Sequence, residues 1–264
     1  MSTAPGISTL KELVGQSVPD LAGKPFSKVD AAGTDNVIYR VGERHALRVA
    51  REHGGIPSLA YREPVAMRSL HDLPLETPEL VAHGLMNEPD GWPWLICTWL
   101  KGNSLESLEY RPTQSDASRL ALFLFELQGQ KRDFAAAPNH DNHWRGIDLV
   151  RRDQLTRMAI SDTAEDFDAI ALLAIWQAAL DAPACRDEDR TWIHGDLHPG
   201  NLLVGSKGIS SVIDWGLSGL GDPACDMMAG FTVFDEPVRD VFWQATGITD
   251  AVWKRARGWA LSTA

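Results

Sequence analysis

The spacing of the apolar residues changes once along this chain, at the polar stretch KGNS of residues 101–104. Before it, three runs alternate apolar and polar side chains and are separated by the turns GTD and GER, at residues 25–32, 36–41 and 45–50. Alternation puts every second side chain on one face of a strand, so these runs predict an antiparallel meander. From about residue 113 the apolar residues recur every three or four positions, which predicts a helix. The change of period therefore predicts an α+β protein.

Turn residues and the spacing of the apolar residues predict where the remaining helices and strands lie. A helix is expected at 58–72, followed by strands at 79–85 and 92–100 on either side of the turn-rich NEPDG. The other expected elements are helices at 147–160 and 163–181, short strands at 190–194, 201–205 and 209–214, and helices to the end of the chain. We therefore predict an N-terminal lobe at 1–101, with an antiparallel sheet, and a mainly helical C-terminal lobe at 102–264.

Charge and cysteine content narrow the class of protein. The 36 acidic residues outnumber the 25 basic ones and give a net charge of −11, which disfavours nucleic-acid and membrane partners and suits cationic small molecules. The chain starts without a signal-peptide pattern, and no apolar run reaches the length of a membrane helix, so we expect a cytoplasmic protein. Cys97, Cys185 and Cys225 lie far apart and are expected to be buried thiols.

The polar motif HGDLHPGN, residues 194–201, lies between two strand-like segments. Asp196 and Asn201 belong to it, and Asp214 follows in the stretch VIDWG. Magnesium takes oxygen ligands, usually one or two from protein and the rest from phosphates and water, so Asn201 and Asp214 suffice to hold it. Asp196 is then left to accept a proton. If the loops converge, the set fits phosphoryl transfer, which needs both a metal and a carboxylate at the attacking hydroxyl.

Two other interpretations of this motif stay open. Asp196, Asn201 and Asp214 also suit turns in which each side chain bonds the local backbone. His194 and His198 have the spacing of a zinc-binding helix, although the glycines and the proline around them disfavour a helix there. Packing of His194 under the loop explains the presence of this histidine better than zinc binding does.

HGDLHPGN and VIDWG together resemble the H-x-D-x-x-x-x-N catalytic loop and the D-x-G metal loop of protein-kinase-like enzymes, in the form used by the aminoglycoside phosphotransferase family, which includes macrolide phosphotransferases. GTDNVIYRVG, HALRVAR, REPVAMRSL, WPWLICTWLKG and GDPACDMM resemble the family's other landmarks in order, so the resemblance covers roughly residues 20–235. It implies a two-lobe protein-kinase-like fold with a hinge at about 97–102. It also implies that Asp196 is the catalytic base and that Asn201 and Asp214 bind Mg²⁺.

The resemblance further implies a site for ATP or GTP in the N-terminal lobe. Thr98 and Leu100 would offer backbone groups to adenine, and Cys97 would lie behind it. Arg48 stands where protein kinases have a strand lysine for the phosphates, and arginine is a bidentate donor. Its expected acidic partner is Glu63, but Pro64 disfavours helical geometry at the residue before it, so this pairing stays open.

The phosphate-binding loop is the least regular part of the resemblance. A G-x-G-x-x-G motif is absent, and the nearest loop is Ala32-Gly33-Thr34-Asp35-Asn36, where Gly33, Thr34 and Asp35 are the candidates for binding the nucleotide. This loop also fits an ordinary hairpin turn. Arg48 also fits a surface strand position, and Glu63 fits an acid in the first turn of a helix.

The sequence thus predicts a kinase that transfers the γ-phosphate of ATP or GTP to a hydroxyl of a small molecule, with an antibiotic as the leading acceptor. Choline, sugar and amino-alcohol kinases share this chemistry, and a catalytically silent nucleotide-binding module is the alternative from another class. Acidic side chains in the acceptor half favour a cationic acceptor. They are Glu165, Asp166, Asp168, Asp222, Asp226, Asp235, Glu236 and Asp240. Asp222 and Asp226 also fit the cap of a helix that begins near Pro223, with contact to the site as the alternative.

Overall fold

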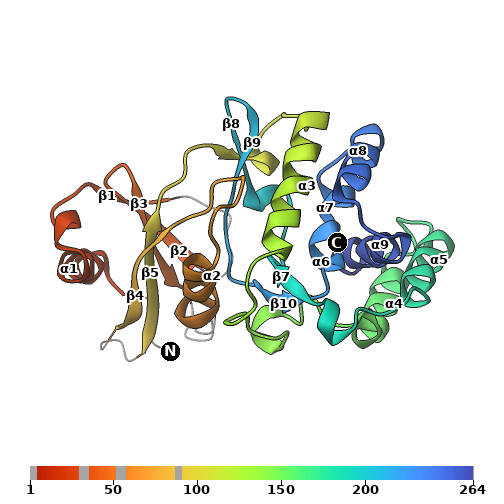
Figure 1. The fold of residues 1–264 in the computed structure, drawn as a ribbon. Coiled ribbons are helices and arrows are strands. Elements are labelled where there is room, and N and C mark those ends of the chain that lie inside the picture. Colours follow the sequence, from red (N-terminus) through yellow and green to blue (C-terminus); the bar gives the residue numbers. More distant parts are fainter. Residues whose placement is uncertain (1–4, 30–35, 52–57, 87–90, 264) are drawn as a thin grey trace.

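The computed structural model describes residues 5–29, 36–51, 58–86 and 91–263. A five-stranded antiparallel sheet forms one end of the molecule, and the helices that follow it along the chain form the other (Figure 1). The predicted α+β class is confirmed. Within the described parts, no helix is both long and apolar enough to cross a membrane.

The sheet is buried on both faces. Its strand order is β1-β2-β3-β5-β4, with β1 (Phe26–Lys28), β2 (Asn36–Val41), β3 (His45–Ala50), β4 (Leu80–Met86) and β5 (Trp92–Thr98). Helix α1 (Ile7–Ser17) covers one face, where Leu10 joins a core cluster with Ile96. On the other face Leu59 packs in a cluster with Leu95. Strand β5 reads WPWLICT without alternation because its side chains meet a packed layer on either side.

Helix α3 (Gln114–Gln128) forms the centre of the second half of the molecule. Its start is fixed by a capping box, in which Thr113 Oγ1 accepts the backbone N–H of Asp116, and the Asp116 carboxylate accepts the N–H of Thr113. The apolar positions expected to share one face are all fully buried, namely Ala117, Leu120, Phe123, Leu124 and Leu127.

The remaining helices pack around α3 in the C-terminal core (Figure 1). They are α4 (Asp153–Asp162), α5 (Ala169–Leu180), α6 (Ala224–Met227), α7 (Ala229–Thr232), α8 (Glu236–Thr246) and α9 (Asp250–Thr263). Helix α8 packs along α3, and α9 packs along α5. Several helix starts were predicted too early: the helix expected at 163–181 begins at Ala169, where Asp168 Oδ1 accepts the N–H of Ala171 at 3.0 Å.

The helix expected at 58–72 has two parts. A π-helical turn at Ser58–Arg62 leads into α2 (Glu63–Ser69), and the chain leaves the helix at Leu70. Pro64 lies in the first turn of α2, where its missing N–H group would have no partner within the helix. Glu63 is therefore helical in spite of the proline that follows it.

Short strands position the loops that matter for function. Strands β6 (Asn103–Ser104), β8 (Leu202–Gly205) and β9 (Gly208–Val212) form one small sheet, and β7 (Thr191–Ile193) pairs with β10 (Gly219–Gly221) in another. Strands β7, β8 and β9 were expected, whereas β6 and β10 were not. The motif of residues 194–201 therefore connects β7 to β8, and Asp214 lies between β9 and β10.

A buried ion pair ties the last helix to the segment before α6. Arg255 on α9 donates from Nε to Asp222 Oδ2 at 2.7 Å and from Nη2 to Oδ1 at 3.0 Å, and the two residues are 7% and 2% exposed. Asp222 Oδ1 also accepts the N–H of Ala224 at the start of α6, as predicted for a capping residue.

We expect Arg255→Met to lower the free energy of unfolding by about 3–5 kcal/mol, because the change leaves the Asp222 carboxylate buried without its partner. Urea denaturation measures this loss. Lys254→Met is the matched control, since Lys254 lies next in α9 but pairs with Asp250 at the surface and should change stability by less than about 1 kcal/mol. Equal losses for the two variants would contradict a special contribution from the buried pair.

Candidate active site

The loop from β7 to β8 brings Asp196 and Asn201 together. A 3-10 turn at Pro199–Asn201 folds the chain back, so that Asn201 Nδ2 donates to the Asp196 carbonyl at 2.9 Å and to Asp196 Oδ2 at 3.1 Å. These bonds use the amide nitrogen of Asn201 and leave its oxygen as the group that can bind a metal. The backbone N–H of Ile213 donates to the Asn201 carbonyl at 3.0 Å, which places Asp214 beside the same loop.

Asp214 adopts a left-handed backbone, with φ of +65°. Aspartate tolerates this conformation better than most residues, and here it follows directly after β9. Its Oδ1 accepts a hydrogen bond from Arg48 Nη2 at 3.0 Å. Burial opposes ionisation of Asp214, but the guanidinium of Arg48 outweighs it and lowers the pKa of the carboxyl group.

Arg48 lies on β3 and links both halves of the molecule. Its Nη1 donates to Glu63, which is fully buried at the start of α2, while Nη2 reaches Asp214. Burial opposes the charge of Arg48, but the carboxylates of Asp214 and Glu63 raise its pKa overall. The open question of the Arg48–Glu63 pair is thus answered by a direct contact. The alternatives of a surface strand position for Arg48 and a mere first-turn acid for Glu63 were wrong.

His194 connects the loop from β7 to β8 with the loop that carries Asp214. It is fully buried, and its Nε2 donates to the Ile213 carbonyl at 3.0 Å, while Nδ1 accepts the N–H of Asp196 at 3.2 Å. The ring also packs edge-on against Trp215, with centroids 4.8 Å apart. His194 is therefore a packing residue, as expected. His198 lies over the loop, with Nε2 at 3.6 Å from Asp196 Oδ2. Within the described residues, no group of three or more His, Cys, Asp or Glu side chains could hold a metal.

The carboxylate of Asp196 lies between the side chains of Arg145 and His198. Arg145 Nη2 donates to Oδ1 at 3.3 Å, and His198 lies on the side of Oδ2. Burial raises the pKa of Asp196, but His198 and Arg145 outweigh burial, and the net shift is downward. Asp196 is therefore ionised at neutral pH and able to accept a proton.

Asp226 fixes the start of the loop from β7 to β8, and its contact with this loop was underestimated from the sequence. Its Oδ2 accepts the N–H of His194 at 2.6 Å, and its Oδ1 accepts the N–H of Gly195 at 2.8 Å. Gly195 has φ of +82°, and a Cβ there would collide with the Leu217 carbonyl. The prediction that Asp226 caps a helix was wrong, and the alternative of contact to the site is correct. The acidic spacing in GDPACD was the signal that could have shown this.

The sequence-predicted nucleotide residues are only partly described. Gly33, Thr34 and Asp35 lie outside the described residues. Cys97 is buried at 4% exposure near the end of β5, and Leu100 follows that strand. The N–H of Thr98 donates to the Glu79 carbonyl at 3.0 Å, and contact of Thr98 backbone groups with adenine stays a prediction.

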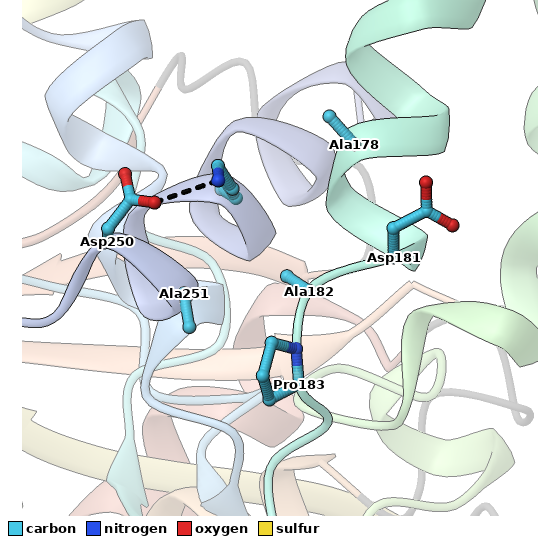
Figure 2. A pocket seen from close by; sticks show the side chains of 7 residues that line it. Ala178, Asp181, Ala182, Pro183, Asp250 and Ala251 are labelled. Carbon is cyan, nitrogen blue, oxygen red and sulfur yellow. Dashed lines mark ion pairs between the residues drawn. The ribbon is translucent and has the colours of Figure 1, made fainter.

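A separate cavity of about 320 Å³ lies between the end of α5 and the start of α9 (Figure 2). An ion pair between Asp250 and Lys254, 2.8 Å long, lies along it. Its wall contains none of the candidate site residues; the lining residues are Ala178, Asp181, Ala182, Pro183, Asp250, Ala251 and Lys254. The candidate site is therefore the junction of the loops after β7 and β9, and not this cavity.

Comparison with known proteins gives a family match. Residues 28–259 match the phosphotransferase enzyme family, APH. The uncharacterized protein YcbJ of Bacillus subtilis (strain 168) is 25% identical over 185 residues, and the match spans 68% of this chain and 57% of that relative's length.

Two solved structures illustrate the fold. The GDP complex of wild-type aminoglycoside 2'-phosphotransferase-IIIa has a TM-score of 0.70 at 17% identity, over 98% of this chain and 88% of the other. The apoenzyme of macrolide 2'-phosphotransferase MphH from Brachybacterium faecium has a TM-score of 0.63 at 19% identity, over 97% of this chain and 88% of the other. The family match covers most of the chain and includes both loops of the site. The chain belongs to the phosphotransferase enzyme family and has its two-lobe, protein-kinase-like fold.

Proposed function

We propose that this protein transfers the γ-phosphate of ATP or GTP to a hydroxyl group of a small molecule. One observation carries the proposal: the carboxylate of Asp196 is held by Asn201 next to the loop of Asp214, and Asp214 is in turn bonded to Arg48 from the sheet. An ionised carboxylate, an oxygen pair for a metal and a cation for phosphate are the parts that phosphoryl transfer requires.

Each residue takes one role in this proposal. Asp196 orients the acceptor hydroxyl and accepts its proton. The amide oxygen of Asn201 and the carboxylate of Asp214 hold Mg²⁺, a donor set that suits its preference for oxygen. Bound Mg²⁺ supplies positive charge that neutralises the phosphate oxygens. Arg48 contacts the phosphates and stays anchored by Glu63.

We also propose the nucleotide contacts that the family resemblance implied. The loop with Gly33, Thr34 and Asp35 covers the phosphates, while Leu100 and Thr98 contact the base and Cys97 lies behind it. The burial of Cys97, which is 4% exposed, fits a place behind the base and not in direct contact with it.

The acceptor in this proposal is an antibiotic of the aminoglycoside or macrolide type. Folds similar to this chain include an aminoglycoside and a macrolide phosphotransferase, which favours this class over choline, sugars and amino alcohols. A catalytically silent module is disfavoured because Asp196, Asn201 and Asp214 are all present and converge. Nucleotide consumption measured with and without Mg²⁺ against aminoglycosides, macrolides, choline and sugars tests the choice. We expect consumption only with Mg²⁺ and with an antibiotic; consumption with choline or a sugar alone would identify a metabolite kinase.

The acidic residues that favoured a cationic acceptor divide into two groups. Asp222 and Asp226 are buried and bonded within the protein. The others are exposed and can act through their field, namely Glu165, Asp166, Asp168, Asp235, Glu236 and Asp240. The exposed acidic residues alone therefore attract a cationic acceptor less strongly than the whole set of acidic residues would.

We expect kcat/KM for a cationic acceptor to fall as ionic strength rises, because exposed charges steer a ligand only within a Debye length, about 8 Å at physiological salt. A salt series at saturating nucleotide and Mg²⁺ measures this dependence. A flat profile, or a preferred acceptor without a basic amine, would contradict the prediction and leave the proposed catalytic roles unchanged.

A further inference from the structure

The segment 139–146 reaches the catalytic loop through an unusual backbone. His143 and Trp144 have φ of +50° and +57°, values that non-glycine residues rarely adopt. Gly146 follows with φ of +76°, and a Cβ there would lie 2.6 Å from Ile193 Cδ1. Backbone of this kind persists only where the surrounding structure holds it, and it is frequent at functional sites.

Contacts from two directions fix this segment. Asn142 is fully buried and donates to the carbonyls of Arg145 at 3.2 Å and Leu217 at 3.3 Å. Arg62, at the start of α2, donates to Asn139 Oδ1 at 2.7 Å and to the Ala137 carbonyl at 3.0 Å. The segment is therefore anchored both to the loop after Asp214 and to the helix that carries Glu63.

The result of this anchoring is the position of Arg145. Its Nη2 donates to Asp196 Oδ1 at 3.3 Å, and its side chain is 15% exposed. Its Nε and Nη1 are buried and have no hydrogen-bond partner among the described residues. A guanidinium has only donors and stays charged, so Nη2 brings a permanent positive charge to the Asp196 carboxylate.

The proposed reaction gives this charge a role. The phosphoryl group moves onto the hydroxyl that Asp196 holds, and its negative oxygens therefore approach a negative carboxylate. The positive charge of Arg145 offsets this repulsion.

We propose that Arg145 orients Asp196 in the free protein and stabilises the transferred phosphoryl group through its positive charge during the reaction. This inference rests on the proposed function. In the step, the bond between the γ-phosphorus and the bridging oxygen breaks, the bond to the acceptor oxygen forms, and the hydroxyl proton passes to Asp196. Arg145 keeps its own protons throughout and stabilises the charge on the phosphoryl oxygens.

Arg145→Met tests the inference, with Arg145→Lys as the conservative variant. We expect the methionine variant to lose roughly 10²- to 10³-fold in kcat, the usual effect of removing one donor from a developing charge, with unchanged affinity for the nucleotide. Lysine should recover part of kcat because it restores the charge without the fork. Arg151→Met is the matched control, since Arg151 is exposed on the following turn, and it should keep wild-type kcat.

A binding measurement separates this role from a purely structural one. We expect Arg145→Met to weaken binding of a nucleoside diphosphate–Mg²⁺–aluminium fluoride complex, which mimics the phosphoryl group in transfer, at least about tenfold, while the diphosphate alone binds as in the wild type. If the wild type is active and Arg145→Met has the same kcat and binds the analogue equally well, the inference is overturned and the proposed function stands. A wild type without transfer to any acceptor would overturn the proposed function together with it.

Discussion

Asp196→Asn is expected to reduce phosphoryl transfer by roughly 10²- to 10⁴-fold, the usual contribution of a general base. Asparagine keeps the shape of the side chain and its one oxygen can still accept one of the bonds from Asn201 and Arg145, but its amide cannot take the proton of the acceptor hydroxyl. Initial rates at saturating acceptor and nucleotide measure the loss, and calorimetric titration should show nucleotide affinity close to that of the wild type.

Asp187→Asn is the matched control for this variant. Asp187 lies before β7 with a side chain that is 88% exposed, so the same loss of charge there should leave the rate unchanged. Near-wild-type turnover by Asp196→Asn on its own acceptor would contradict the assignment and return Asp196 to the role of a turn residue.

Asp214→Ala is expected to abolish most of the effect of Mg²⁺ on nucleotide binding. The change removes the anionic metal ligand, and loss of even an indirect metal contact typically costs about 10- to 100-fold in affinity. Arg48 keeps its partner Glu63 in this variant, so the sheet and α2 should stay joined. Titration of the nucleotide with and without Mg²⁺ measures the difference, and an unchanged dependence on the metal would show that Asp214 does not bind it.

The parts of the site that lie close together in the sequence could be predicted from it. Asp196 and Asn201 share one loop, and Asp214 follows after one short hairpin, so their convergence depends on few connections. The apolar period also placed α3 and the strands of the sheet well, because burial of one face leaves a regular pattern.

The residues that hold these groups in position could not be predicted in the same way. Asp226 reaches His194 across 32 positions, and Arg145 reaches Asp196 across 51, so the sequence does not show which groups these two side chains contact. Strand β10 is three residues long and rich in glycine, which gives no alternation to detect. Helix starts were missed where a single side chain, such as Asp168, decides them.

The coupling between the lobes also depends on long-range contacts. Arg48 on β3 joins Glu63 and Asp214, and Arg62 joins the start of α2 to Ser218. The sequence suggested the first partner of Arg48 and left it open because of Pro64. The structure shows that the π-helical turn at Ser58–Arg62 leads into α2 so that the proline falls in its first turn.

Detection of the product tests the central claim most directly. The wild type, incubated with Mg²⁺, γ-labelled ATP or GTP and a panel of aminoglycosides and macrolides, should transfer the label to a hydroxyl of at least one antibiotic. Asp196→Asn in the same mixture should leave that antibiotic unlabelled. Label that appears only as free phosphate, or equal labelling by wild type and Asp196→Asn, would contradict the proposal that this site transfers phosphate to a small-molecule hydroxyl.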